Sequence, residues 1–460
     1  MNKQRQLFGT DGIRGVAGEF PLSQAGVYAI GQALGRDLAS RDLAAGGSAP
    51  RAVIGQDTRE SSAWIADRLT QGLASQGVVV ESAGVITTPG VAYLARTRDF
   101  AAGVVVSASH NPWTDNGIKI FSGDGYKLPD AHELAIEKDI FAMLSAETPA
   151  LRNATGSSLP GNPELRRAYI DWLAQSVPTD LRGLRVLVDC ANGAAAVEAP
   201  ELFQACGIQA SFLCAAPDGR NINHDCGALH PANLARAVAA QPGDFALGVT
   251  FDGDADRALF SDAEGRVVNG DGVLLLAARD MKSRGVLAND MVVATTMSNM
   301  GLEVALREAG IQMLRANVGD RYVLEEMRRT GATLGGEQSG HILFRDHDAT
   351  TGDGLLTALR VMEVMARTGR SLADLVSGLK VFPQTIQNVR VLEKTPLHEV
   401  AEIEKAILAA ERELEGNGRV VVRYSGTEAL ARVMIEAQSE EKMTRLAASI
   451  AGAIREKLGA

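Results

Sequence analysis

The chain has 460 residues, 5% of them aromatic, and its 46 basic and 56 acidic side chains give a formal net charge of −10. At about 150 residues per domain this length predicts about three domains, and the negative charge with few aromatics excludes a general nucleic-acid-binding protein. No apolar segment typical of a signal peptide precedes Asp11, and no run of about 18 uncharged apolar residues follows. We therefore expect a soluble, cytoplasmic protein that binds neither nucleic acid nor a membrane.

A pattern of apolar strand, small or polar turn, helix, glycine and second strand occurs three times along the chain. Its helical segments end near Gly77, Gly207 and Gly310, where glycine favours termination of a helix. The first strands of the three copies begin at Val53, Val186 and Met291. Copies more than about 100 residues apart exclude a solenoid and predict repeated α/β domains.

Two changes of composition divide the chain further. Residues 148–163 are rich in proline, glycine and serine and predict a linker. After about Phe382 the pattern predicts a smaller α+β unit, with strands, a helix, strands and a final helix at residues 389–392, 397–414, 420–424, 432–437 and from Ser439 onward. We expect an α/β protein with α/β domains at residues 1–160, 161–265 and 266–380 and an α+β domain at 381–460.

An acidic motif directly follows the apolar run at residues 245–250 and predicts a metal site. It reads Asp252-Gly253-Asp254-Ala255-Asp256-Arg257. Three carboxylates at alternate positions can converge on one hard cation such as Mg²⁺. An EF-hand would need a glycine and a glutamate where Arg257 and Ala263 stand, so that site is excluded. A solvated acidic turn is the competing interpretation.

A second motif places serines and a histidine in a turn after the apolar strand at residues 104–106. It reads Ser107-Ala108-Ser109-His110-Asn111-Pro112. Either serine could be a nucleophile, and hydrogen bonding within the turn is the competing interpretation. No G-x-S-x-G motif occurs, which disfavours an α/β-hydrolase.

Three further loops carry side chains suited to ligands, although an ordinary turn is the competing interpretation for each. The loop at residues 8–15 places Arg14 among glycines that permit close backbone approach. The loop at 335–341 offers groups suited to sugar hydroxyls, and the loop at 423–428, with Arg432 beyond it, offers groups suited to phosphate. No P-loop motif occurs, which argues against a nucleoside triphosphate as phosphate donor.

The four cysteines lie in one stretch of the chain but never in a C-x-x-C pair. They are Cys190, Cys206, Cys214 and Cys226. The spacing disfavours a zinc ribbon or a redox pair, so we expect reduced and mostly buried thiols.

Taken together in this order, the five motifs resemble the α-D-phosphohexomutase superfamily over nearly the whole chain. The segments at residues 217–223 and 318–322, the pair Cys226-Gly227 and Gln338 are similar to its bacterial glucosamine-specific branch. The resemblance implies four domains around a central cleft, three related α/β domains with mixed sheets and a C-terminal α+β domain. It also implies interconversion of glucosamine 6-phosphate and glucosamine 1-phosphate through a phosphoserine and a bisphosphorylated sugar, which would feed amino-sugar and peptidoglycan precursor synthesis.

The resemblance also implies roles for individual residues. Ser109 would be the phosphoserine and would bind Mg²⁺ together with Asp252, Asp254 and Asp256. The other catalytic residues would be Arg14, Lys119 and His341. Substrate would be bound by Arg257, Glu337, Ser339, Arg423, Ser425, Gly426, Thr427 and Arg432. Glucose or glucosamine 1,6-bisphosphate would act as activator, the partner would be a small sugar phosphate, and the protein would be a monomer or homodimer.

The sequence departs from the family pattern at Tyr424, Ala429 and Ala255. The first two put the rigidity of the phosphate loop in doubt, whereas the methyl group of Ala255 should be tolerable. The glucose- and mannose-specific branch of the superfamily is the alternative. A magnesium-dependent phosphatase and a non-catalytic sugar-phosphate sensor are alternatives from other classes.

Overall fold

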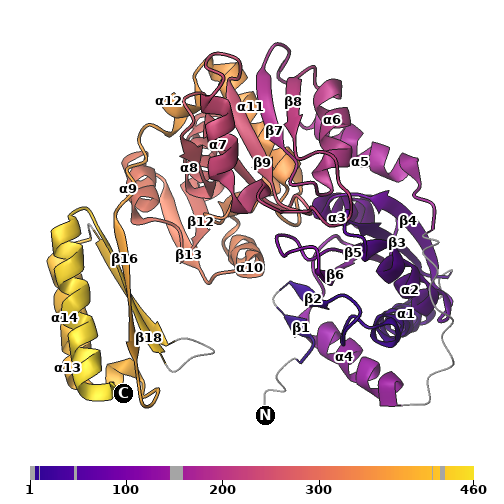
Figure 1. Ribbon diagram of the computed structural model, residues 1–460, viewed down its shortest axis with the longest axis horizontal. Coiled ribbons are helices and arrows are strands. Elements are labelled where there is room, and N and C mark those ends of the chain that lie inside the picture. The colour runs from indigo at the N-terminus through magenta and orange to yellow at the C-terminus, as the bar shows by residue number, and fades with distance from the viewer. Residues whose placement is uncertain are drawn as a thin grey trace. The chain divides into compact units, whose positions relative to one another are not determined.

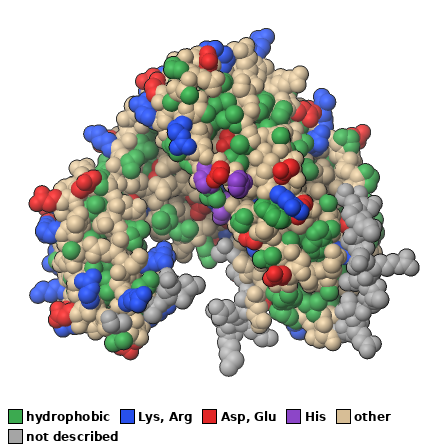
Figure 2. Space-filling view, viewed as in Figure 1, with side chains coloured by type: hydrophobic (Ala, Val, Ile, Leu, Met, Phe, Trp, Pro, Cys, Tyr) green, Lys and Arg blue, Asp and Glu red, His purple; other side chains and the backbone are tan. Residues whose placement is uncertain are grey.

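The computed structural model describes residues 6–9, 11–45, 49–145, 159–416, 418–424 and 430–459. The chain divides into two compact units, of which one comprises residues 1–297 and 313–376 and the other residues 298–312 and 377–460. Basic and acidic side chains are interspersed on the face drawn in Figure 2. Among the described residues, no helix combines the length and the apolar character that crossing a membrane requires.

The first sheet of the larger unit carries the serine motif at the end of a central strand (Figure 1). Its order is β1-β2-β6-β5-β3-β4, with β4, β3 and β5 parallel and the others antiparallel. Because side chains alternate along a strand, Ile54 and Val104 join one core cluster, while Val53 and Val105 join another. The elements are β1 (Phe8–Gly9), β2 (Gly12–Val16), α1 (Gln24–Ala45), β3 (Arg51–Gln56), α2 (Ser62–Ala74), β4 (Val79–Val85), α3 (Thr88–Thr97), β5 (Ala102–Val106), β6 (Asp115–Ser122) and α4 (Asp130–Ser145).

The second sheet carries the acidic motif directly after its central strand β9. Its order is β11-β10-β9-β7-β8, with β9, β7 and β8 parallel and β10 and β11 antiparallel. Every residue of β9 is buried, as the uninterrupted apolar run predicts. The elements are α5 (Pro163–Gln175), β7 (Arg185–Asp189), α6 (Ala195–Ala205), β8 (Gln209–Leu213), η1 (Gly227–Leu229), α7 (Pro231–Ala239), β9 (Leu247–Phe251), β10 (Ala258–Asp262) and β11 (Val267–Val268).

The third sheet, of order β13-β12-β14-β15, places the sugar-loop motif in the connection between β14 and β15. Strands β12 and β14 are parallel, and β14 and β15 are antiparallel. Helix α8 contacts β14 as well as α11 and α12. The elements are α8 (Gly270–Ser283), η2 (Ala288–Asp290), β12 (Met291–Thr295), β13 (Gln312–Ala316), α10 (Asp320–Thr330), β14 (Leu334–Gly336), β15 (Ile342–Phe344), η3 (Arg345–His347), α11 (Gly354–Thr368) and α12 (Leu372–Val376).

The smaller unit is an antiparallel sheet of order β16-β18-β17, against which α14 packs. Ser439 caps α14 by accepting a hydrogen bond from the backbone N–H of Lys442 at 3.2 Å, as the predicted helix start requires. Strand β16 begins five residues before the predicted Val389. The prediction missed this start because the first residues of the strand are mostly polar and exposed and so show no apolar pattern. The elements are α9 (Met300–Glu308), β16 (Gln384–Arg390), η4 (Leu397–Glu399), α13 (Ala401–Leu414), β17 (Gly418–Tyr424), β18 (Leu430–Ala437) and α14 (Glu440–Leu458).

The three glycines expected at helix ends are confirmed. Gly77, Gly207 and Gly310 have φ angles of 82°, 71° and 68° and follow α2, α6 and α9. Such left-handed conformations favour glycine because it lacks a Cβ atom. Of the predicted linker at 148–163, residues 148–158 lie outside the described part, and α5 begins at Pro163.

A buried polar cluster lies beneath the aromatic side chains of α3 and α5. The hydroxyl of Tyr169 donates a hydrogen bond to Asp353 Oδ2 at 2.7 Å, and Glu198 Oε2 accepts one from the backbone N–H of Thr87 at 3.1 Å. Among the described residues Glu198 Oε1 has no hydrogen-bond partner. Burial, reinforced by the negative charge of Asp353, raises the pKa of Glu198 to about 8.

We predict that Glu198→Gln reduces the pH dependence of stability. In the folded state the carboxyl group keeps its proton up to a higher pH than in the unfolded state. The wild type therefore loses stability as pH rises from about 4.5 to about 8. Relative to the variant, the wild-type free energy of unfolding should fall by at least about 1.4 kcal/mol across this range, the equivalent of one pKa unit. Denaturant unfolding at several pH values measures the difference, and parallel curves for the two proteins would contradict the prediction.

Candidate active site

The larger unit contains a cavity of about 400 Å³ that is lined from all three of its sheets. The lining includes Asp11 and Arg14 of the first loop, Arg257 after the acidic motif, and Glu337 and His341 of the sugar loop. A volume of this size suits a small organic ligand. Two of the loops expected from sequence to bind ligands, at residues 8–15 and 335–341, therefore meet the acidic motif at one cavity.

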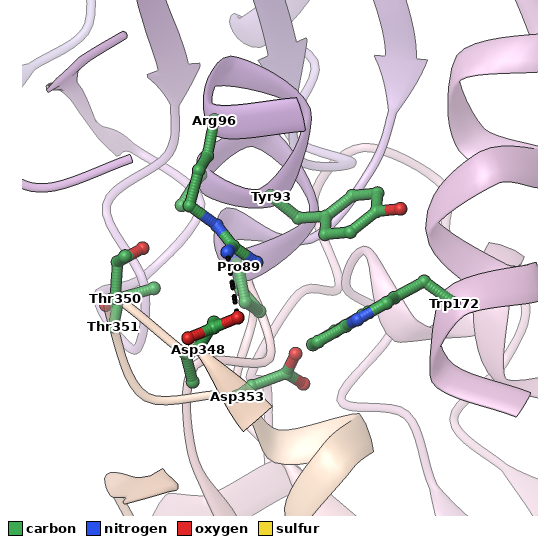
Figure 3. A pocket seen from close by; sticks show the side chains of 10 residues that line it. Pro89, Tyr93, Arg96, Trp172, Asp348, Thr350, Thr351 and Asp353 are labelled. Carbon is green, nitrogen blue, oxygen red and sulfur yellow. Dashed lines mark ion pairs between the residues drawn. The ribbon is translucent and has the colours of Figure 1, made fainter. Parts of the chain in front are cut away.

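A second hollow shown in Figure 3 is much smaller, at about 20 Å³. Its wall combines the stacked rings of Tyr93 and Trp172, 4.8 Å apart, with an ion pair between Arg96 and Asp348. Such a volume holds about one water molecule. It is too small for a sugar phosphate.

Ser109 lies just beyond the buried end of β5 in a left-handed conformation with φ of 52°. Its backbone carbonyl accepts hydrogen bonds from Arg59 Nη2 at 3.0 Å and from Asn223 Nδ2 at 2.9 Å. These contacts hold a conformation that is unfavourable for a residue with a Cβ atom. As a result the Ser109 hydroxyl donates a hydrogen bond to Asp252 Oδ2 at 2.5 Å.

The three aspartates of the acidic motif converge, since one carboxylate oxygen of each lies within 4.8 Å of the others. Asp252 and Asp254 are fully buried, and Asp256 is 6% exposed. Ala255 between them has a φ of 53°, so the methyl group at this position is accommodated in a left-handed turn. The interpretation of the motif as a solvated turn is therefore wrong.

Lys119 on β6 neutralises part of this charge. Its Nζ lies 2.7 Å from Asp254 Oδ2, 3.1 Å from Asp256 Oδ2 and 3.0 Å from Asp11 Oδ2. Burial would lower the pKa of Lys119, but the three carboxylates raise it well above its usual value. The lysine therefore remains charged in a position that water barely reaches.

The carboxyl groups of the cluster differ in protonation. Burial and the charges of Asp256 and Asp254 raise the pKa of Asp252 to about 8. Burial would also raise the pKa of Asp256, but Lys119, His341 and Arg257 hold it well below the usual value. Asp252 is thus the protonated member near neutral pH in the absence of a cation.

These residues fit a hard divalent cation. Within the described ranges, neither Asp254 Oδ1 nor Asp256 Oδ1 has a hydrogen-bond partner, although both are buried. Buried carboxylate oxygens normally have partners, and Mg²⁺ prefers oxygen ligands of this kind. The donor set therefore matches the cation that the sequence predicts.

A chain of ion pairs connects this cluster to the third sheet. Arg14 Nη2 donates a hydrogen bond to Asp11 Oδ2 at 2.6 Å, while Lys127 Nζ lies 2.5 Å from Asp11 Oδ1 and 2.6 Å from Asp320 Oδ2. Burial would raise the pKa of Asp11, but Lys119 and Lys127 hold it well below its usual value. Lys127 therefore ties the first loop to the start of α10.

The histidines of the site have different surroundings. His110 Nδ1 lies 3.3 Å from Ser109 Oγ, and burial with the charges of Arg257 and Arg14 lowers the pKa of His110 to about 4, so it is neutral near pH 7. His341 Nε2 accepts a hydrogen bond from the backbone N–H of Gly352 at 2.9 Å, and its Nδ1 lies 3.7 Å from Asp256 Oδ1.

The sugar loop is held by its own polar contacts. Glu337 Oε1 accepts a hydrogen bond from the backbone N–H of Gly319 at 2.9 Å, and Glu337 Oε2 accepts one from the Ser339 hydroxyl at 3.3 Å. Gln338 Nε2 donates to Asp271 Oδ2 at 3.2 Å. The amide of Gln338 thus contacts the first turn of α8, whereas Glu337 and His341 of the same loop line the cavity.

The phosphate-loop residues belong to the smaller unit. Arg423 on β17 stands directly opposite Arg432 on β18. Ser425, Gly426 and Thr427, predicted to bind substrate, lie outside the described residues, as does Ala429.

Several residues that hold the site were not among the predicted site residues. Asp11, Asn223 and Asp320 stand inside motifs that the sequence singles out, so their positions were marked although their roles were not. Arg59 follows the end of β3, which is parallel to β5. Because the carboxyl ends of parallel strands meet at one edge of a sheet, its position after a strand could have identified Arg59 as a site residue. No motif marks Lys127.

Comparison with protein families assigns nearly the whole chain to one family. Four family models match, described as Phosphoglucomutase/phosphomannomutase alpha/beta/alpha domains I, II and III and the C-terminal domain. They match residues 5–147, 167–265, 269–382 and 387–453, respectively.

Individual relatives indicate which branch of this family the chain resembles. A phosphoglucosamine mutase from Koribacter versatilis (strain Ellin345) is 62% identical over 457 residues, which cover 99% of this chain and 98% of the relative. The solved structure of a phosphoglucomutase/phosphomannomutase family protein from Burkholderia thailandensis has a TM-score of 0.79 at 26% identity and covers 98% of this chain and 97% of that one. The N-acetylphosphoglucosamine mutase of Aspergillus fumigatus, solved in complex with GlcNAc-6P and magnesium, shares the fold with a TM-score of 0.63 at 19% identity over 99% of this chain and 96% of that one. The chain therefore belongs to the phosphoglucosamine mutase family, among proteins built from the four phosphoglucomutase/phosphomannomutase domains.

Proposed function

We propose that this chain interconverts glucosamine 6-phosphate and glucosamine 1-phosphate through a phosphorylated Ser109 and a bisphosphorylated sugar. The observation that carries the proposal is the 2.5 Å contact between Ser109 Oγ and Asp252 Oδ2, which places a hydroxyl at the buried acidic cluster. The enzyme is then an isomerase that works by phosphoryl transfer. The reading as a phosphoglucomutase or phosphomannomutase is weaker, because the 62% identical relative is a phosphoglucosamine mutase.

The acidic cluster and the phosphate of Ser109 would hold one Mg²⁺. The ligands would be the phosphate together with Asp252, Asp254 and Asp256, and the ion would stabilise negative charge on the transferring phosphoryl group. Lys119 adds a second fixed positive charge at the same carboxylates. Since water is excluded here, these charges act with little screening.

The chain orients the reacting serine through its backbone. Arg59 and Asn223 hold the Ser109 carbonyl, so the side-chain oxygen of Ser109 would stay directed at the cluster both as a free hydroxyl and as a phosphate ester. His341 orients Asp256, because its Nε2 is engaged by Gly352 and its Nδ1 faces the carboxylate. Arg14 stands at the cavity wall, where it can contact the sugar phosphate.

Two sets of residues would bind the rest of the substrate. Glu337 and Arg257 line the cavity and would bind sugar hydroxyls, with Ser339 orienting Glu337. Arg423 and Arg432, which stand directly opposite each other on β17 and β18, would bind the phosphate that does not react, because guanidinium groups match the geometry of phosphate oxygens. Ser425, Gly426 and Thr427 would complete that phosphate site.

The remaining parts of the proposal rest on the sequence analysis alone. Domain limits at residues 160, 265 and 380, a cytoplasmic location and a monomer or homodimer are predictions of this proposal. Glucose or glucosamine 1,6-bisphosphate would restore the phosphate on Ser109 whenever an intermediate escapes. The product would supply amino-sugar and peptidoglycan precursor synthesis.

We predict that Ser109→Ala abolishes both phosphorylation and isomerisation, because it removes the hydroxyl that contacts Asp252. Intact mass of purified wild type should include a species heavier by one phosphate, and this species should be missing from the variant. Ser145→Ala, an exposed serine on α4, is the control and should behave as the wild type. Unchanged mutase activity in Ser109→Ala would overturn the proposal.

The choice of sugar has its own test. With Mg²⁺ and a catalytic amount of glucose 1,6-bisphosphate, we expect kcat/KM for glucosamine phosphate to exceed that for glucose and mannose phosphates by at least about tenfold, equivalent to about 1.4 kcal/mol. The measurement is isomer interconversion followed directly by NMR. A preference for mannose phosphate would favour the alternative branch, and release of inorganic phosphate would indicate a phosphatase.

We predict that Lys127→Met lowers kcat/KM by at least about tenfold. Its loss leaves Asp11 and Asp320 without the cation that joins them, so the loop bearing Arg14 loses its attachment to α10. Lys127→Arg should recover most of the activity, and Lys138→Met, at an exposed lysine on α4, should leave it unchanged. Equal activity of Lys127→Met and Lys138→Met would show that the bridge does not position the site.

A further inference from the structure

A second group of metal-ligating side chains lies at one end of the second sheet, outside the acidic motif. One donor atom each of Asp189, Cys214 and Cys226 lies within 4.8 Å of the other two. Asp189 ends β7, and Cys214 directly follows β8, its parallel neighbour, so the paired strands bring the two side chains to the same edge (Figure 1). Asp189 and Cys226 are 2% exposed, whereas Cys214 is half-buried.

The backbone fixes the positions of these donors. Asp189 Oδ1 accepts a hydrogen bond from the backbone N–H of Ala191 at 2.9 Å, and Oδ2 accepts one from Gly227 at 2.8 Å. The carbonyl of Cys214 accepts one from the N–H of Asn192 at 2.6 Å. The Cys214 thiol also hydrogen-bonds to this carboxylate, and loss of its proton on metal binding would free a lone pair for the cation. The carboxylate is thus oriented before any ligand binds.

The two sulfur donors at this position favour a soft cation. Burial raises the pKa of Asp189, and burial together with the charge of Asp189 raises the pKa of both Cys214 and Cys226. Among the described residues, the groups that set the pKa of Asp189 are backbone N–H groups, Thr250 and Cys214, and none of these is a cation. A divalent metal would supply the missing positive charge and stabilise both thiolates.

We propose that Asp189, Cys214 and Cys226 bind one Zn²⁺, with water as the fourth ligand. On binding, the two thiols release their protons to solvent and the carboxylate stays ionised. Tetrahedral Zn²⁺ with Zn–S bonds of about 2.3 Å places two sulfurs about 3.8 Å apart, which is compatible with donor atoms that lie within 4.8 Å of one another. Thiolate ligands select zinc, whereas the three aspartates offer oxygen alone and suit magnesium, so the chain separates the two metals by ligand type.

The alternative for the two cysteines is oxidation to a disulfide. A disulfide would use only the two sulfurs, whereas a carboxylate oxygen of Asp189 lies within the same 4.8 Å of both and adds a third ligand. The metal site is therefore the better account of the cluster, although the cysteine spacing alone does not reveal it.

The zinc would stabilise the loop that holds the reacting serine. Cys214 and Cys226 bracket residues 215–225, within which Asn223 Nδ2 donates hydrogen bonds to the carbonyls of Ser109 and Asn111 at 2.9 and 3.2 Å. Joining both ends of this loop through one ion restricts its motion. The site would then be a structural zinc centre that supports the phosphoserine loop.

Metal titration of the full-length protein tests the proposal. The protein is stripped with a chelator, supplied with excess Mg²⁺ to occupy the aspartates, and titrated with Zn²⁺ and separately with Co²⁺, whose thiolate charge-transfer absorption reports sulfur ligands. We expect one equivalent of each metal to bind, and Zn²⁺ to raise the Tm. Cys214→Ser and Cys226→Ser should lose at least tenfold in affinity, while Cys206→Ser, at a cysteine outside the cluster, should bind as the wild type.

A measurement on the wild type alone covers the case in which the variants do not fold. Zn²⁺ should protect Cys214 from alkylation while Cys206 stays reactive, as read by peptide mass. The proposal is overturned if the wild type takes up no zinc, if the thiolate absorption is absent or persists in both variants, or if peptide mass shows a Cys214–Cys226 disulfide in place of metal uptake.

Discussion

The arrangement of the active site depends on one buried ammonium group, that of Lys119. Its Nζ contacts carboxylates from two different parts of the chain: Asp11, between β1 and β2, and the pair Asp254 and Asp256, after β9. A buried charge is tolerated only when it is fully paired, and removing one partner of such a group costs about 3–5 kcal/mol. The first and second sheets are therefore joined at the point where the chemistry takes place.

The charge at this point is also a physical reason for a metal in the proposed mechanism. With Ser109 phosphorylated as proposed, the phosphate and the three aspartates would carry about −5 together, and the cations Lys119 and Arg257 would compensate only part of this. Burial together with the charges of Asp256 and Asp254 raises the pKa of Asp252, so part of the same imbalance already acts on the carboxylates alone. In the proposed mechanism this uncompensated negative charge would be useful, because it attracts Mg²⁺ and cationic side chains to the place where the phosphoryl group is transferred.

Much of this could be predicted from sequence, because the motifs are local. The acidic motif and the serine motif each follow a buried strand, so their residue types, order and position at a strand end could be recognised without a structure. The ion-pair bridge through Lys127 could not, since its partners Asp11 and Asp320 are far apart in sequence and no spacing rule joins them. The early start of β16 was missed for a related reason, because its polar residues face outward and show no apolar pattern.

The backbone conformation of Ser109 has a consequence for which hydroxyl amino acid can occupy that position. With φ at 52°, the residue lies in a region where branching at Cβ brings additional steric crowding. Threonine offers the same hydroxyl chemistry, but its extra methyl group would oppose the turn that directs the oxygen toward Asp252. If Ser109 is the phosphate acceptor, as proposed, the fold of this loop favours serine over threonine independently of any difference in reactivity between the two alcohols.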